Sequence, residues 1–330
     1  MGRSLDEACE EKPLGHPMPM PPVIRNEDFR VQMTTSCRDA DSIPKVHRAG
    51  QVTLAQGETV QIMHNGLQVV AGGYYGEWMS RIIQELKGHH EPQEELIFHH
   101  LMRLMSPSAT MIELGGFWSY YSLWFLNGAP SRRAIVIEPD PNHLAVGKRN
   151  AQLNGAANVE FVQASAGDQC LSPRSFQTES AGLQTVAETT VAQIMNENGL
   201  ASLDFLHCDI QGNETRVLQA CEQLFRDKKI AFCMVSTHSH HISNDPLTHQ
   251  RCLSMISDFG GQILAEHDVH ESFSGDGLIA AYFGRDHLNW EAPAISRNRY
   301  ATSLFRNPLY DLADHLGIPG HSPGSAWSSQ

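Results

Sequence analysis

The sequence lacks the features that membrane-spanning and secreted proteins need. Its 330 residues contain no apolar run near the roughly 20 residues that cross a bilayer. No basic segment leads into an apolar one at the amino terminus, so we expect no signal peptide. The seven cysteines include no CxxC pair, which favours reduced thiols over a disulfide framework or a zinc site. We therefore expect a cytoplasmic protein without a membrane partner.

Positive charge is also scarce. Lys and Arg number 24 against 37 Asp and Glu, which gives a formal charge of −13. Nucleic acid and anionic lipid attract basic surfaces, so we expect neither of them as a partner. Hydrophobic residues make up 41% of the chain, enough for a substantial core. The composition indicates an acidic globular protein.

Four segments of the chain differ in pattern. Residues 1–50 are rich in proline and poor in apolar periodicity, which predicts an amino-terminal arm or extension. Residues 51–105 contain short strand patterns and a helical pattern from Glu94 to Met105, and we interpret them as a cap or substrate segment. Residues 106–284 predict the main domain and residues 285–330 a tail. The extensions at both ends leave open a homo-oligomer in which they pack on a neighbouring subunit.

Strand and helix patterns alternate through the main domain, which predicts an α/β fold with a mostly parallel sheet covered on both faces. The last two of the seven strands have no helix between them, so we expect them to pair as an antiparallel edge. The expected strands are Thr110–Leu114, Ala134–Glu138, Val159–Gln163, Leu203–Asp209, Ile230–Ser236, Gln262–Glu266 and Leu278–Phe283.

The first two strands end in residues that suit an adenosine-type ligand. Gly115 and Gly116 follow the first strand and allow a sharp turn and close approach of a ligand. Glu138, followed by Pro139, ends the second strand, where a carboxylate can accept hydrogen bonds from both ribose hydroxyls. Ligands of open α/β sheets bind beyond the carboxyl ends of the strands. The predicted cofactor-binding residues are Glu113, Gly115, Gly116, Phe117, Glu138, Pro139, Asp168 and Asp209.

The loop after the first strand also indicates which cofactor to expect. The GxGxxG fingerprint of dinucleotide sites is missing, because Gly115-Gly116 is followed by Phe117, Trp118 and Ser119. Bulky side chains there favour a ligand without a pyrophosphate, namely S-adenosylmethionine. A nicotinamide-dependent oxidoreductase on a similar sheet remains an alternative.

These motifs together resemble those of FkbM-type methyltransferases, over roughly residues 88–283. The resemblance implies a class I (Rossmann-like) fold, S-adenosylmethionine as cofactor, and methyl transfer to a hydroxyl oxygen, often of a sugar or secondary metabolite. The similar segments are Met111–Leu123, Val136–Asn142, Asn150–Gly155, Ala166–Asp168, Leu203–Gly212 and the upstream His90–Glu95.

Two positions depart from the family pattern. The first loop of the family usually reads Asp-x-Gly-Ala-Asn, whereas here it reads Glu113-Leu-Gly-Gly-Phe117. The motif after the fourth strand usually reads Asp-x-Glu-Gly, whereas here it is Asp209-Ile-Gln-Gly212. These departures leave open a catalytically silent binding protein with the same fold.

Candidates for the chemistry follow the fourth and fifth strands. Methyl transfer to oxygen needs a positioned acceptor and a way to remove its proton. Asp209 is placed to orient the acceptor, and the resemblance implies His238 as the base or acceptor-binding group, with a pKa suited to neutrality. We expect Glu214, His240 and His241 to contact the substrate, a small molecule or glycan. No metal is assigned, although a divalent cation on Asp209 and His238 stays open.

Two other features are interpreted as structural. The Ser274-Gly-Asp-Gly277 loop is taken as a turn before the last strand. Trp124 is taken as a core residue of the helix after the first strand, because aromatic residues on such a helix usually pack inward.

Overall fold

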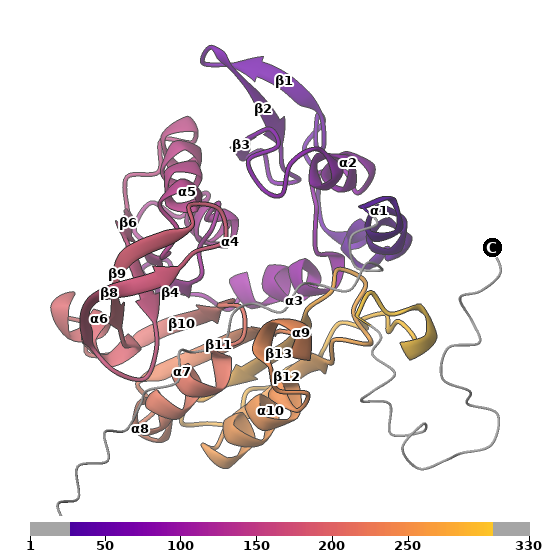
Figure 1. Ribbon diagram of the computed structural model, residues 1–330. Coiled ribbons are helices and arrows are strands. Elements are labelled where there is room, and N and C mark those ends of the chain that lie inside the picture. The colour runs from indigo at the N-terminus through magenta and orange to yellow at the C-terminus, as the bar shows by residue number, and fades with distance from the viewer. Residues whose placement is uncertain (1–26, 306–330) are drawn as a thin grey trace, which may run out of the picture.

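The computed structural model describes residues 27–305. Residues 1–26 of the arm predicted for residues 1–50, and residues 306–330 of the tail predicted for residues 285–330, lie outside the described residues. Figure 1 shows a large sheet with helices on both faces, and a small amino-terminal sheet set apart from it near α1 and α2.

The main sheet has seven strands in the order β12-β13-β11-β10-β4-β5-β6. The five adjacent strands β11, β10, β4, β5 and β6 are parallel to one another. The predicted seven-stranded, mostly parallel α/β sheet is confirmed. The strands are β4 (Thr110–Leu114), β5 (Arg133–Ile137), β6 (Val159–Val162), β10 (Leu203–Cys208), β11 (Ile230–Thr237), β12 (Gln262–His267) and β13 (Gly277–Tyr282).

The antiparallel strand β13 lies one place in from the edge. It pairs antiparallel with both β11 and β12, and its register sets Gly277 opposite Thr237. An antiparallel strand begins where its parallel neighbours end. The loop before β13 therefore lies at the same edge of the sheet as the loops that follow β4, β5, β10 and β11.

Two hydrophobic cores cover the two faces of the sheet. Because side chains alternate along a strand, Met111 and Leu114 of β4 belong to different cores. The helices α3 and α4 contribute to the first core, and α6, α7, α8 and α10 to the second. The helices that follow β4 along the chain are α4 (Tyr120–Leu126), α5 (Pro141–Leu153), α6 (Val191–Glu197), α7 (Glu214–Ala220), α8 (Glu222–Arg226), α9 (His240–Ser243) and α10 (Thr248–Asp258).

A second small sheet lies between β6 and α6, in the order β7-β9-β8. Its strands are β7 (Ala164–Ala166), β8 (Leu171–Gln177) and β9 (Leu183–Thr189). Sequence reasoning did not predict β8 and β9. Most side chains of β8 are exposed or half-buried, so the strand has no apolar alternation to reveal it.

The amino-terminal segment packs against the main domain through specific polar contacts. The backbone N–H groups of Val70 and Gln68 donate to the side-chain oxygens of Asn150 and Asn154 on α5, at 2.8 and 2.9 Å. These bonds satisfy the open edge of β3. The elements are α1 (Glu27–Ser36), the 3-10 helix η2 (Asp39–Ser42), β1 (Val52–Ala55), β2 (Glu58–Ile62), β3 (Gln68–Val70), α2 (Glu77–Glu85) and α3 (Pro92–Met102).

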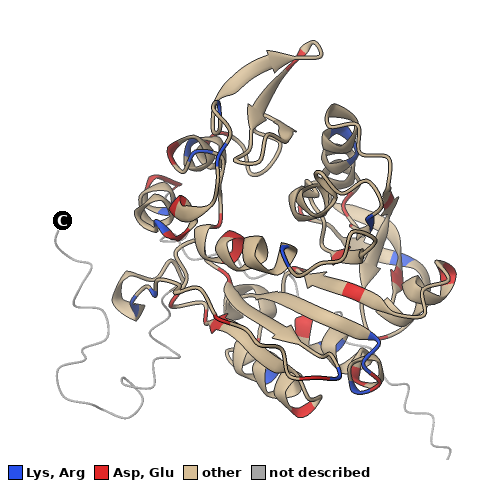
Figure 2. Ribbon diagram, turned by 180° about the vertical axis from the view of Figure 1, so that it is seen from behind, with Lys and Arg blue, Asp and Glu red and all other residues tan. Residues whose placement is uncertain are grey.

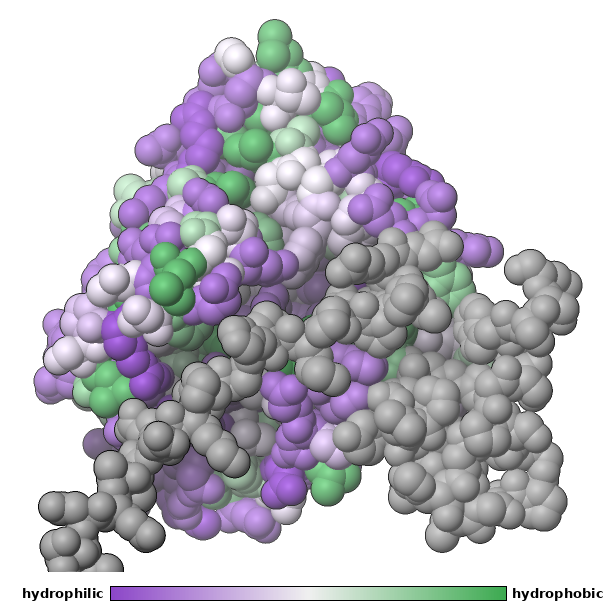
Figure 3. Space-filling view, in the orientation of Figure 1, coloured by the Kyte–Doolittle hydropathy of each residue, from purple (hydrophilic) through white to green (hydrophobic). Residues whose placement is uncertain are grey.

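The surface of the described chain is polar and mixed in charge. Figure 2 shows acidic and basic residues interspersed over the helices and loops. In Figure 3, hydrophobic residues form scattered spots, among them the region of the β1–β2 hairpin, where Leu54 is 74% exposed. Between residues 27 and 305, no helix has both the length and the apolar character needed to cross a bilayer.

The loop after β4 depends on a glycine that a matched control can isolate. A Cβ on Gly115 would lie 1.7 Å from the carbonyl oxygen of Asp209, whereas a Cβ on Gly128 would meet nothing within 4 Å, although both residues have positive φ. We expect Gly128→Ala to lower the free energy of unfolding by about 1 kcal/mol through φ strain alone. Gly115→Ala should lower it by at least about 3 kcal/mol, because the loop must also move. Chemical denaturation of both variants measures the difference, and equal losses would contradict the close approach.

Candidate active site

The glycines after β4 bring that loop against the end of β10. A Cβ at Gly115 would overlap the backbone of Asp209, and one at Gly116 would lie 2.1 Å from Cγ1 of Val136. Sequence reasoning assigned these glycines to ligand approach. In the structure both glycines are also needed for packing, because the strand ends approach too closely to leave room for a Cβ.

Glu138 is held at the end of β5 by backbone donors. Its side chain accepts hydrogen bonds from the N–H groups of Phe117 and Asp140, both at 2.9 Å, and the residue is only 5% exposed. Burial raises the pKa of Glu138 to about 7, even though both backbone donors lower it. Phe117 has a φ of 39°, and its ring stacks on His143 at 3.5 Å, so the bulky side chain lies over α5. Pro139 follows directly.

Glu113 at the end of β4 belongs to a buried acid–imidazole chain. His207 lies between Glu113, at 3.7 Å, and Glu94 of α3, at 3.2 Å. Burial lowers the pKa of His207, but its hydrogen bonds and charge pairs with the two carboxylates raise it to about 10 overall. Among the described residues, Oε2 of Glu113 has no hydrogen-bond partner although it is buried. A buried carboxylate oxygen without a partner is costly, and a ligand cation would satisfy it.

An aromatic segment that sequence reasoning missed packs against the loop after β4. The ring of Tyr74 stacks on Trp118 at 4.6 Å and meets Phe117 edge-on at 4.9 Å. Tyr75 lies beside it, and its hydroxyl accepts a hydrogen bond from Nε2 of Gln211 at 3.4 Å. Two aromatic residues between glycines have no periodicity and match no catalytic motif, so the sequence alone carried no signal for this contact.

His238 occupies the centre of the edge where β10 and β11 end. Its Nδ1 lies 2.7 Å from Oε1 of Glu214, and its Nε2 lies 3.2 Å from Oδ1 of Asp209. Burial lowers the pKa of His238, but the carboxylates of Asp276, Glu214 and Asp209 raise it well above 6.5 overall. At neutral pH the ring is therefore a cation that donates from Nδ1 to Glu214, with Asp209 as an ion-pair partner at Nε2. The general-base role stays a prediction; it needs a ring nitrogen with a free lone pair, which the cationic form of His238 lacks.

Asp276 is brought to this cluster from the loop before β13. Its Oδ1 lies 3.7 Å from Nε2 of His238, and its side chain is 24% exposed. We had interpreted the Ser274-Gly-Asp-Gly277 loop as a simple turn, and the structure adds a charged contact to that interpretation. The antiparallel register of β13 produces this contact, and nothing in the local sequence signals it.

The remaining predicted residues lie in other surroundings. Asp168 forms an ion pair with Arg216 of α7, which lowers the pKa of Asp168. His240 and His241 follow each other on α9 with ring centroids 3.8 Å apart. Burial lowers the pKa of both, that of His240 to about 4, so both are neutral near pH 7. Glu214 is buried and also accepts from the Gly212 N–H at 2.9 Å.

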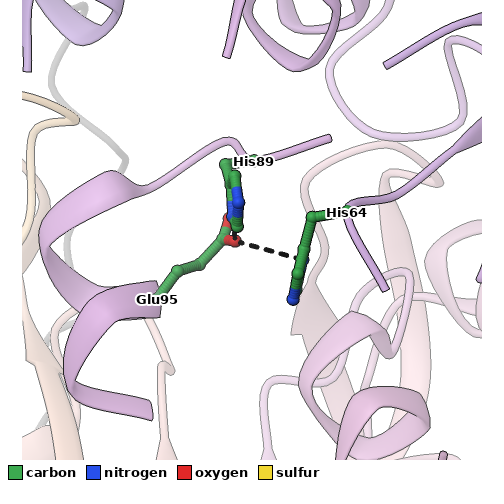
Figure 4. Close-up of side chains that lie close together, drawn as sticks. All are labelled: His64, His89 and Glu95. Atoms are coloured by element: carbon green, nitrogen blue, oxygen red, sulfur yellow. Dashed lines mark hydrogen bonds and ion pairs between the residues drawn. The ribbon is translucent and has the colours of Figure 1, made fainter. Parts of the chain in front are cut away.

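Within residues 27–305, one group of three side chains has the composition of a metal site. His64, His89 and Glu95 are buried, and their potential ligand atoms lie within 4.8 Å of one another. Figure 4 shows the two imidazole rings face to face beside the carboxylate. The ring planes differ by 18° with centroids 4.2 Å apart, so the in-plane lone pairs run side by side and do not converge on one ion. Nδ1 of His64 also lies 2.9 Å from the Tyr120 hydroxyl, and the group is a hydrogen-bonded network.

A surface hollow of 590 Å³ lies away from these residues. It is lined by the end of α5 and the start of β6, including Lys148, Gly155 and Val159. That is the edge where the parallel strands begin, whereas open α/β sheets bind their ligands where the strands end. The buried carboxylates at the ends of β4 and β5 mark the candidate site better than this hollow.

The strand order and the acidic strand ends define a class I methyltransferase fold. Residues 107–263 match the family model of the methyltransferase FkbM domain. The family match confirms the resemblance inferred from the motifs over this part of the chain. No curated protein matches the chain.

Solved methyltransferase structures show distant similarity. Precorrin-6y C5,15-methyltransferase from Geobacter metallireducens is 13% identical with a TM-score of 0.38, over 58% of this chain and 88% of that one. A SAM-dependent methyltransferase from Aquifex aeolicus is 10% identical with a TM-score of 0.35, over 56% and 89%. The METTL16 methyltransferase domain is 13% identical with a TM-score of 0.40, over 58% and 68%. Similarity this distant identifies no substrate.

Glu214 should control the charge of His238. Glu214→Gln replaces the carboxylate that lies 2.7 Å from Nδ1, so the pKa of His238 should fall. Histidine NMR titration measures this shift. Glu197→Gln removes an exposed carboxylate at the end of α6 and serves as the control, which should leave His238 unchanged. An unaltered His238 titration in Glu214→Gln would contradict the assigned pairing.

Proposed function

We propose that the protein is an S-adenosylmethionine-dependent O-methyltransferase that acts on a hydroxyl of a small molecule, a sugar or a secondary metabolite. The observation that carries the proposal is the pair of buried carboxylates at successive strand ends. Glu113 has an unpartnered buried oxygen, and Glu138 is fixed by two backbone donors. The FkbM domain match and the class I strand order support the same activity.

The residues at this edge fit the proposed cofactor. Glu113 can accept a hydrogen bond from the cationic amino group in the methionine part of S-adenosylmethionine. That bond would give the buried Oε2 of Glu113 a partner. The Glu138 carboxylate can accept from the ribose hydroxyls, since each of its oxygens has a lone pair beyond the one used by Phe117 or Asp140. Once bound, S-adenosylmethionine supplies the methyl group as an electrophile, so the protein needs no covalent nucleophile. The loop lacks the glycine spacing that would hold a dinucleotide pyrophosphate.

Asp209, His238 and Glu214 form the proposed acceptor side of the site. The half-buried Asp209 carboxylate can accept from an acceptor hydroxyl, while the His238 cation keeps it oriented through the 3.2 Å contact. Glu214 holds the other face of His238. Carboxylates around the site disfavour a phosphorylated or sulfated acceptor, because like charges repel strongly at low dielectric. His240 and His241 on the adjoining α9 are proposed to contact the acceptor.

Calorimetry with S-adenosylhomocysteine and NADH tests the proposal. We expect the wild-type protein to bind S-adenosylhomocysteine and to give no response to NADH. Binding should tighten as pH rises through about 7, because the ionised Glu138 carboxylate accepts from both ribose hydroxyls and burial keeps it protonated below that pH. Glu138→Gln should weaken binding roughly tenfold or more and remove this pH dependence.

Each alternative function predicts a different result in this experiment. Binding of NADH without S-adenosylhomocysteine would contradict the proposal in favour of an oxidoreductase. Tight S-adenosylhomocysteine binding, with no methyl transfer to any of a broad panel of sugars, polyols and phenols, would favour the silent binding protein that Phe117 and Gln211 leave open. Glu160→Gln on β6 removes an exposed carboxylate outside the site and should leave binding unchanged.

A further inference from the structure

In the cluster around His238, the carboxylate of Asp276 has no structural role described so far. Glu214 and Asp209 occupy the two ring nitrogens of His238 at 2.7 and 3.2 Å. Asp276 lies 3.7 Å from Nε2, its only ion pair within the described residues. Its side chain is 24% exposed, so it faces the open side of the cluster and not the core.

Backbone packing holds Asp276 in this position. Gly277 pairs with Thr237, the residue before His238, so the two side chains leave adjacent strand ends. A Cβ on Gly277 would lie 2.5 Å from Oγ1 of Thr237 and 2.9 Å from Nδ1 of His249. The start of β13 therefore lies too close to β11 to shift easily, and Asp276 is presented at the edge where the parallel strands end.

We propose that the carboxylate of Asp276, rather than the imidazole of His238, receives the proton of the acceptor hydroxyl during methyl transfer. This inference rests on the proposed function. As the acceptor oxygen bonds to the methyl carbon, the carbon–sulfur bond breaks and its electron pair stays on sulfur. The hydroxyl proton passes to an oxygen of Asp276, and Asp209 with the His238 cation orients the acceptor.

The electrostatic environment of Asp276 suits a general base. Burial raises its pKa to about 7; His238 lowers it, Asp209 and Glu91 raise it, and Arg30 of α1 lowers it. Tyr74 also lies within the field of Asp276. A base whose pKa is near the working pH is partly ionised and still binds a proton well. Because a raised pKa keeps a carboxyl protonated in acid, the base is available only as pH rises through about 7.

Two measurements without turnover test this assignment. In protein with carboxyl-labelled aspartate, carbon-13 NMR should show one Asp titrating near pH 7, and Asp276→Asn should remove that signal. Sinefungin carries an amine where S-adenosylmethionine carries its methylated sulfonium. We expect wild-type protein to bind sinefungin about tenfold more tightly than S-adenosylhomocysteine, through attraction to Asp276. Asp276→Asn should bring the two affinities close to equal, and Asp276→Glu should restore part of the preference.

Asp286→Asn removes an exposed carboxylate shortly after β13 and should keep both the signal and the preference. A sinefungin preference that is unchanged in a folded Asp276→Asn protein would overturn the inference while leaving the proposed function intact. Failure of wild-type protein to bind either ligand would overturn the proposed function itself.

Turnover with an acceptor from the panel gives a further test. Asp276→Asn should lower turnover about 100-fold or more and remove the rise of turnover with pH near 7. A loss of turnover below about twofold would contradict the base role.

Discussion

The burial of carboxylates at one edge of the sheet is the constraint on which the candidate site depends. Glu94, Glu113 and Glu214 are buried, and an isolated buried charge of this kind costs several kcal/mol. The fold offsets that cost with imidazoles: His207 lies between Glu94 and Glu113, and His238 faces Glu214. Each histidine thereby becomes a cation.

This pairing divides the polar residues into two kinds. His207 and His238 are charged and paired with carboxylates, which suits them to orientation and not to proton removal. Glu113, Glu214 and Asp276 each retain a carboxylate oxygen without a hydrogen bond from the described residues, and of these we propose Glu113 and Asp276 as the groups to which a ligand adds. Glu113 faces the proposed cofactor amino group and Asp276 the acceptor.

Much of this arrangement is predictable from sequence. The strand patterns of the main domain and the acidic residues that end them, Glu113, Glu138 and Asp209, lie where periodicity and strand-end logic put them. Sequence also indicated His238 as central. Its protonation state was out of reach, because Asp276, one of the carboxylates that raise the pKa of His238, comes from a part of the chain far from Asp209 and Glu214.

Other features depend on long-range geometry alone. Asp276 enters the site because β13 runs antiparallel and pairs with β11, a register that no local pattern encodes. Tyr74 meets Trp118 only because the amino-terminal segment folds back onto α5. Strand β8 was missed for a different reason, since a strand without a buried face carries no apolar alternation.

A crystal structure of the protein with bound S-adenosylhomocysteine tests the central claim most directly. The account predicts that the ribose hydroxyls bond to Glu138, that the amino group bonds to Glu113, and that the sulfur faces the side on which Asp209, His238 and Asp276 converge. A nucleoside bound elsewhere would contradict the account, as would a sulfur directed away from Asp276.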